Sequence, residues 1–125
     1  MAKSHAPGFL KIAEEAKQQV TETSPLDVKK RQDANETFHL VDVREDNEWA
    51  AGHLPNAIHL GRGIIERDIE KTILNPSDPI VLYCGGGYRS ALAAVSLAKM
   101  GYTNVLSLAG GFSGWTEAGL KVVKE

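Results

Sequence analysis

The amino-acid sequence predicts an α/β fold with a mostly parallel sheet, and three short apolar runs carry that prediction. Residues 38–43, 80–83 and 105–108 are rich in β-branched and apolar side chains and are too short to be helices. Such runs are typical of strands that are covered on both faces. Segments with helical spacing separate them, and this alternation favours parallel strands joined by right-handed crossovers.

The composition restricts the function classes. A chain of 125 residues is the size of one domain and can bury about two-thirds of its extended-chain surface. An apolar content of 42% and a net charge of -2 fit a soluble globule and argue against nucleic acid or a membrane as a partner. The single cysteine, Cys84, excludes an internal disulfide and a cysteine-rich metal site, so we expect no metal and no cofactor.

The first residues bear on where the protein works. The segment MAKSHAPGFLK lacks the apolar core of a secretory signal, so we expect a cytoplasmic protein with a reduced thiol. A mature form cut from a longer exported precursor is the alternative that the sequence leaves open.

We divide the chain into a helical arm, residues 1–23, and a domain, residues 24–125. Apolar residues recur at near-helical spacing over residues 6–20 and predict an amphipathic helix that packs on the domain. A helix that binds a partner is the alternative interpretation of the same pattern.

The remaining elements follow from capping residues and periodicity. Ser24, followed by Pro25, is a favourable helix start and predicts a helix over about residues 25–33. In chain order we then expect a strand at 57–60, a helix at 64–74, a helix at 90–100 and a short helix after 110–111.

The chemistry is predicted at Cys84, which follows the strand 80–83 and opens a turn of three glycines, residues 85–87. Glycine takes positive φ without steric cost, so the turn can direct its N–H groups toward one point as an anion-binding nest. The helix that begins near Ser90 adds unpaired N–H groups and the positive end of its dipole. Both effects favour a thiolate, and Arg89 adds a permanent positive charge for an oxyanion.

The alternative is that Cys84 is a small buried hydrophobe, as lone cysteines more often are. The surroundings favour chemistry, because one glycine usually suffices in a strand-to-helix turn and packing does not require an arginine beside it. A dinucleotide-binding loop is a weaker interpretation, since a cysteine stands at the head of this turn.

Asp42 and Arg44 lie at the carboxyl end of a strand, where open parallel sheets bind ligands. A carboxylate among apolar residues must be satisfied by hydrogen bonds or cations. We therefore expect Asp42 to give structural support, by capping its turn or by holding Arg44 or the Cys84 loop.

Two arginines are candidates for contact with a substrate anion. Arg44 either has this role or forms a surface ion pair with Glu45 or Glu48. Arg62 follows the next predicted strand and is a second candidate. We expect His53 to brace its turn rather than to act as an acid or base.

Three ordered motifs are CGGGYR at residues 84–89, VDVRE at 41–45 with Glu48 and GHLPNA at 52–57, and GGFSGW at 110–115. They resemble the signatures of the rhodaneses, a family of sulfurtransferases. The first is similar to the family's six-residue active-site loop, with cysteine first, glycine fourth and arginine or threonine last. Together the motifs span about residues 38–120.

The resemblance implies a central, mostly parallel sheet of about five strands with helices on both faces. It also implies transfer of a sulfane sulfur, through a persulfide on Cys84, from thiosulfate or another persulfide donor. The acceptor would be thiophilic: cyanide, a small thiol or a protein thiol. Substrate would be bound by the loop and two arginines: Gly85, Gly86, Gly87, Tyr88, Arg89, Ser90, Arg44 and Arg62. Tyr88 could instead pack, and Arg89 could hold the loop shape.

Two other functions stay open. A persulfide carrier or rhodanese-like interaction module would hold sulfur on Cys84 without turnover on small donors. A cysteine phosphatase also uses a thiolate, an N–H cradle and an arginine, but with five residues between cysteine and arginine, whereas four separate Cys84 from Arg89. The shorter loop makes a smaller cradle, which favours sulfur.

Glycine at 85 and 86 departs from the basic residues common in thiosulfate-handling loops, which leaves the physiological donor open.

Overall fold

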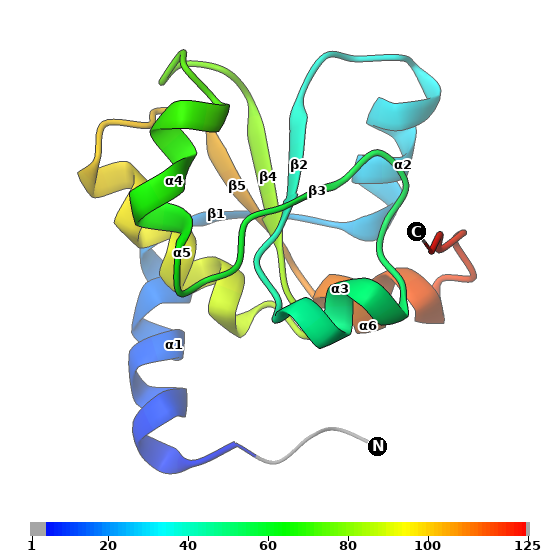
Figure 1. Ribbon diagram of the computed structural model, residues 1–125. Helices are drawn as coiled ribbons and strands as arrows, with labels where there is room; N and C mark the ends of the chain where they lie inside the picture. The colour runs from blue at the N-terminus through cyan, green and yellow to red at the C-terminus, as the bar shows by residue number, and fades with distance from the viewer. Residues whose placement is uncertain (1–4, 125) are drawn as a thin grey trace.

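A computed structural model describes residues 5–124 and has a five-stranded parallel sheet at its centre (Figure 1). The strand order is β1-β5-β4-β2-β3, and every neighbouring pair is parallel. The strands are β1 (Thr21–Thr23), β2 (His39–Asp42), β3 (Ile58–His59), β4 (Ile80–Tyr83) and β5 (Val105–Leu108). The predicted α/β class and the sheet of about five strands are confirmed.

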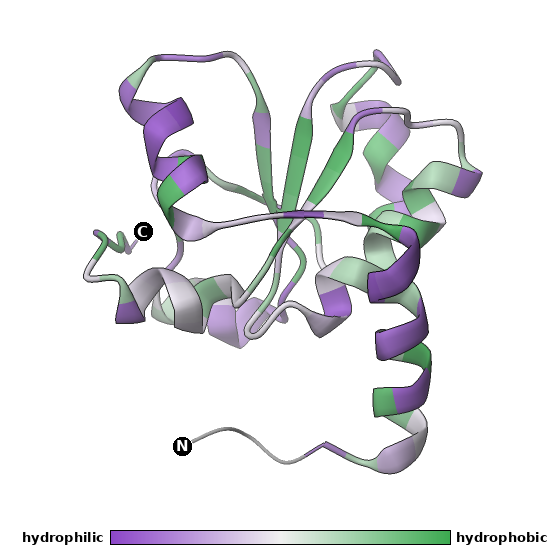
Figure 2. Ribbon diagram, turned by 180° about the vertical axis from the view of Figure 1, so that it is seen from behind, coloured by the Kyte–Doolittle hydropathy of each residue, from purple (hydrophilic) through white to green (hydrophobic). Residues whose placement is uncertain are grey.

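Helices cover both faces of the sheet, as predicted. They are α1 (Pro7–Gln19), α2 (Pro25–Asp33), α3 (Asp46–Ala51), α4 (Ile65–Thr72), α5 (Tyr88–Lys99) and α6 (Gly111–Glu117). Helices α4 and α5 pack on one face, and α2 and α6 on the other. Helix α1 lies against α5 and alternates between hydrophobic and hydrophilic residues (Figure 2). Within residues 5–124, we find no helix long and apolar enough to span a bilayer.

Strand β4 shows why the core has two halves. All four of its residues are buried, and successive side chains point to opposite faces of the sheet. Ile80 and Leu82 therefore join the hydrophobic cluster under α4 and α5. Val81 and Tyr83 join the cluster under α2 and α6. This strand carries Cys84 directly at its carboxyl end, so the cysteine starts from a rigid support.

The structure corrects the expected elements at several places. Strand β1 was not expected, because its sequence Thr-Glu-Thr is short and polar; it forms because it pairs with β5 along Thr21–Thr23. Helix α5 begins at Tyr88, two residues earlier than expected from the sequence, and α4 is shorter than residues 64–74. The start of α2 is as predicted, with the Ser24 hydroxyl accepting a hydrogen bond from the Asp27 N–H.

The neighbouring carboxyl ends of β2 and β4 bring two of the three motifs together. Asp42 lies beside Tyr83 in the register of the sheet, and the Val43 N–H donates to the Tyr83 carbonyl at 2.9 Å. The segment after β2 therefore runs alongside the start of the Cys84 loop.

Candidate active site

Cys84 sits at the floor of the site with its sulfur held by backbone. The residue is 1% exposed, and the Gly87 N–H donates to Sγ at 3.1 Å. Gly87 has φ +99 and is the N-cap of α5, so glycine is required for the backbone to aim this N–H at the sulfur. The arrangement stabilises negative charge on sulfur with a fixed dipole at a helix N-terminus.

Two buried serines lie beneath the sulfur. Ser90 Oγ is 3.6 Å from Cys84 Sγ and 2.8 Å from the hydroxyl oxygen of Ser107. Ser90 was predicted as part of the loop, whereas Ser107, on β5, carries no local signal in the sequence. A hydroxyl can donate to a thiolate or accept from a thiol, so this pair adapts to either state of Cys84.

A second glycine turn clamps the Cys84 loop from the α6 side. The Phe112 N–H donates to the Cys84 carbonyl at 2.7 Å, and the Ser113 N–H donates to the Gly85 carbonyl at 3.0 Å. Gly111 has φ +53, and a Cβ there would overlap the carbonyl oxygen of Cys84. Only glycine allows the two backbones to approach this closely.

Asp42 holds Arg44. Its carboxylate accepts from the Arg44 backbone N–H at 2.8 Å and from Nη2 at 2.8 Å, so it both caps the turn and binds the guanidinium. Nη2 also donates to the Gly52 carbonyl at 2.6 Å, and the guanidinium lies over the Phe112 ring at 4.2 Å. Burial lowers the pKa of Arg44, but the hydrogen bond and charge of Asp42 raise it above its usual range. Of the two interpretations of Arg44, the surface ion pair with Glu45 or Glu48 is not formed, because Arg44 makes a buried pair with Asp42.

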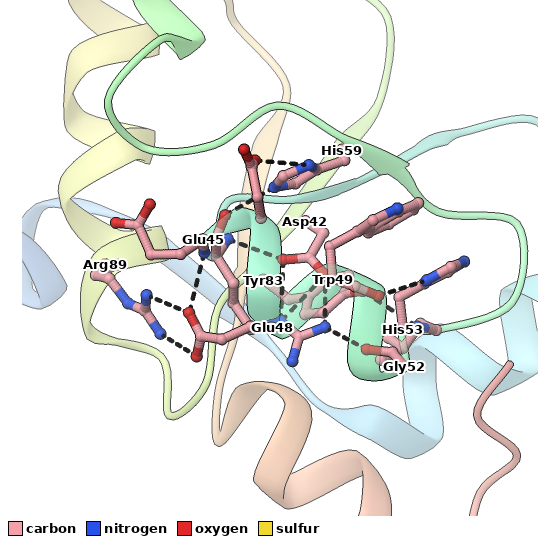
Figure 3. A network of polar contacts seen from close by, with 12 residues as sticks. Asp42, Glu45, Glu48, Trp49, Gly52, His53, His59, Tyr83 and Arg89 are labelled. Carbon is pink, nitrogen blue, oxygen red and sulfur yellow. Dashed lines mark hydrogen bonds and ion pairs between the residues drawn. The ribbon is translucent and has the colours of Figure 1, made fainter. Parts of the chain in front are cut away.

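Arg89 is paired as well. Its guanidinium donates to both carboxylate oxygens of Glu48, at 2.9 and 3.2 Å, and so joins α5 to α3 (Figure 3). The hydrogen bond from Arg89 lowers the pKa of Glu48 to about 2. Arg89 lies beside Gly85 and also lines the cleft, so both roles considered for it, holding the loop shape and attracting an anion, stay predictions.

The turn after α3 is braced by His53 and Tyr83. His53 Nδ1 donates to the Trp49 carbonyl at 3.2 Å, and the two rings stack with centroids 3.5 Å apart. The Tyr83 hydroxyl accepts from the Leu54 N–H at 3.1 Å, and burial raises the pKa of this tyrosine. Figure 3 shows these residues around Asp42. They orient the wall of the site rather than enter it.

A cleft of about 720 Å³ opens above Cys84. The loop forms its floor, and Arg44, Glu48 and Arg89 form one side, with α6 adjoining through Phe112 and Glu117. Among residues 5–124, no cluster of three or more metal-ligating side chains is present.

Arg62 and Tyr88 differ in their relation to the cleft. Arg62 does not line it, and its guanidinium pairs with Glu66 at 2.9 Å. Tyr88 does line the cleft and also packs against α1, so both roles considered for its ring are present.

Two relatives are similar over most of the described chain. The thiosulfate sulfurtransferase GlpE of Actinobacillus pleuropneumoniae is 33% identical over 93 residues, which cover 70% of this chain and 80% of the relative. YrkF of Bacillus subtilis, named as a candidate sulfur carrier protein, is 33% identical over 88 residues, or 70% of this chain and 46% of YrkF. The chain thus spans about half the length of that relative.

Solved structures share the fold. The polysulfide-sulfur transferase homodimer of Wolinella succinogenes matches with a TM-score of 0.77 and 31% identity over 94% of this chain and 88% of that one. A protein of unknown function from Rhodopseudomonas palustris, described as a possible tyrosine phosphatase, matches with a TM-score of 0.81 and 26% identity over 98% and 99%. The model of the Rhodanese-like domain matches residues 24–118. The chain belongs to the rhodanese-like domain family.

Proposed function

We propose that the protein is a sulfurtransferase that carries a sulfane sulfur as a persulfide on Cys84. The observation that carries the proposal is the buried Cys84 sulfur, which receives the Gly87 N–H and faces a cleft. The family and the names of its sulfur-handling relatives support sulfur transfer in general. Thiosulfate or another sulfane-sulfur donor, and a cytoplasmic location, belong to this proposal.

The reaction has two displacement steps. The Cys84 thiolate attacks the outer sulfur of thiosulfate, the S–S bond breaks, and sulfite leaves with the bonding electron pair. The product is Cys84–S–S⁻, whose charge is stabilised by the Gly87 N–H and the α5 N-terminus. Cyanide or a thiolate then attacks the terminal sulfur and regenerates the Cys84 thiolate. Such a covalent relay predicts ping-pong kinetics.

The proposed substrate-binding set follows the cleft. It keeps Arg44, Cys84, Gly85, Gly86, Tyr88 and Arg89, which line the cleft, and it leaves out Arg62, which does not. Gly87 and Ser90 do not line the cleft and act through their contacts with the Cys84 sulfur. Asp42 acts through Arg44 by fixing its guanidinium. We also propose that residues 24–125 form the sulfur-transfer domain and residues 1–23 an arm upon it, whose last three residues add β1 to the sheet; residues 1–4 and 125 lie outside the described range.

The carrier alternative is favoured by one observation, the likeness to YrkF. A carrier would accept sulfur on Cys84 but would not cycle with small acceptors. The phosphatase alternative conflicts with the loop, which has four residues between Cys84 and Arg89 and whose arginine is paired with Glu48.

The test is thiocyanate formation from thiosulfate and cyanide, run beside a phosphate ester, with the wild type and Cys84→Ser. We expect turnover that the serine variant loses, and no phosphate release. A mass gain of one sulfur on Cys84 without turnover would identify a carrier. Phosphate release that depends on Cys84 would overturn the proposal.

A further inference from the structure

One wall of the cleft is aromatic and comes partly from α1. We call His5, Phe9 and Tyr88 the aromatic wall; all three line the cleft. Their ring centroids are 5.3 Å apart for His5 and Phe9, 4.8 Å for His5 and Tyr88, and 6.1 Å for Phe9 and Tyr88. Such a surface attracts an apolar group, whereas a strongly hydrated anion would lose water there without compensation.

The charged side chains of the cleft are already neutralised. In the described part of the chain, the cations that line the cleft are Arg44 and Arg89, and carboxylates bind both. Two carboxylates line the cleft, Glu48 and Glu117, and the buried Asp42 binds Arg44. Together they carry three negative charges against the two positive charges of Arg44 and Arg89. A doubly charged anion therefore meets no excess of positive side chains in this lining.

Apart from these side chains, the groups that attract an anion act only close to the Cys84 sulfur. The Gly87 N–H reaches one sulfur atom, and the α5 N-terminus adds its dipole. The Lys17 ammonium is near the wall but lies over the Tyr88 ring, 4.9 Å from its centroid. The site is thus suited to a single negative sulfur with an apolar group beside it.

We propose that the sulfur donor is an organic persulfide, R–S–SH, whose apolar R group packs on the aromatic wall. This inference rests on the proposed function and names its substrate class. The Cys84 thiolate attacks the outer sulfur, the S–S bond breaks, and its electron pair leaves on R–S⁻. The persulfide proton passes to that thiolate, which gives R–SH and Cys84–S–S⁻. The step needs no oxidant or reductant.

The experiment measures sulfur loading of Cys84 in single turnover by intact mass. The donors are benzyl persulfide, 2-hydroxyethyl persulfide as a hydrophilic counterpart, and thiosulfate. Each loading efficiency is divided by the rate of the same donor with free cysteine, which removes differences in intrinsic reactivity. We expect benzyl persulfide to exceed both other donors by about tenfold.

Three variants of α1 test whether the preference for benzyl persulfide arises from the aromatic wall. Phe9→Ser should lower the efficiency of benzyl persulfide about tenfold and leave thiosulfate within about twofold, because only the apolar donor uses the wall. Phe9→Leu, which keeps an apolar side chain, should retain most of the preference. Ile12→Ser is the matched control, since Ile12 is 51% exposed on the same helix and should not alter either donor.

Glu48 offers a test of how charge in the cleft affects thiosulfate. Glu48→Gln removes one carboxylate charge and should raise thiosulfate loading several-fold at low salt, with the gain lost at high salt. Unchanged thiosulfate loading would show that the carboxylates of the cleft do not disfavour this dianion.

The outcomes separate the two proposals. Thiosulfate loading equal to that of benzyl persulfide, or equal losses for both donors in Phe9→Ser, would overturn this inference and leave sulfur transfer intact. If no donor placed sulfur on Cys84, the proposed function itself would fail.

Discussion

The two glycine turns of the site differ in what they contribute. The turn at residues 85–87 follows the nucleophile and directs an N–H at its sulfur. The turn at Gly110–Gly111 carries no reactive group, yet its following N–H groups bind the carbonyls of Cys84 and Gly85. One turn carries the chemistry, and the other fixes the position of the first.

The difference shows where a backbone-built site obtains its rigidity. A glycine loop alone would sample many conformations, because glycine restricts φ and ψ least. Here the carbonyls of the loop are held from α6, and its arginine is held from α3. The cradle is therefore preorganised by contacts between distant parts of the chain, which is the condition for fixed dipoles to stabilise a developing charge.

The largest expected effect comes from Gly111→Ala. The added Cβ would overlap the Cys84 carbonyl oxygen in a backbone conformation that alanine disfavours, so we expect a loss of about 3 kcal/mol in the free energy of unfolding. Sulfur loading of Cys84 should fall with it. Denaturant unfolding and intact mass measure the two effects. Gly63→Ala is the control, because nothing lies within 4 Å of its added Cβ; equal stability of the two variants would refute the clamp.

Gly87→Ala should have a smaller effect on stability and a large one on sulfur loading. The φ of +99 costs alanine about 1–2 kcal/mol, and relief of that strain would move the N–H that contacts Cys84 Sγ. We expect slower persulfide formation in single turnover while the protein stays folded by circular dichroism. Loading at the wild-type rate would show that this N–H does not stabilise the sulfur anion.

The smallest effect is a pH dependence that arises from Glu48 and Arg89. The pKa of Glu48 is about 2 in the folded protein and lies below its unfolded value, so the pair stabilises the fold fully above pH 4.5. This contribution should fade as the pH falls from about 4.5 to 2, and because both side chains are partly exposed we expect about 1 kcal/mol. The free energy of unfolding, measured as a function of pH for the wild type and for Glu48→Gln as the reference, tests this contribution. An identical pH profile for the two proteins would rule out the linkage.

Local patterns were sufficient to predict the core of the site. The run at residues 80–83, the glycines after Cys84 and the small residues beyond them are contiguous, so the strand, turn and helix follow from neighbouring residues. The carboxylate of Asp42 was predictable as support for the same reason, since Arg44 lies only two residues away.

Other parts depend on distant contacts that no local pattern reports. Glu48 and Arg89 are 41 residues apart in the sequence. The close approach of Gly111 to the Cys84 carbonyl forms only when α6 is packed against the loop. Strand β1 has only three residues and no apolar pattern to report it, and it forms because β5 offers it a backbone partner. Arg44 and Arg62 both follow strands, yet of the two only Arg44 lines the cleft, whereas Arg62 pairs with Glu66.

The lengths of the strands have a consequence for how molecules of this protein meet one another. The two outermost strands, β3 and β1, have two and three residues, whereas each of the three inner strands has four. An edge strand exposes unpaired N–H and C=O groups that can recruit a strand from another chain, and very short edges limit this pairing. The sheet therefore ends in borders that give another chain little to pair with, although most residues of its central strands are apolar.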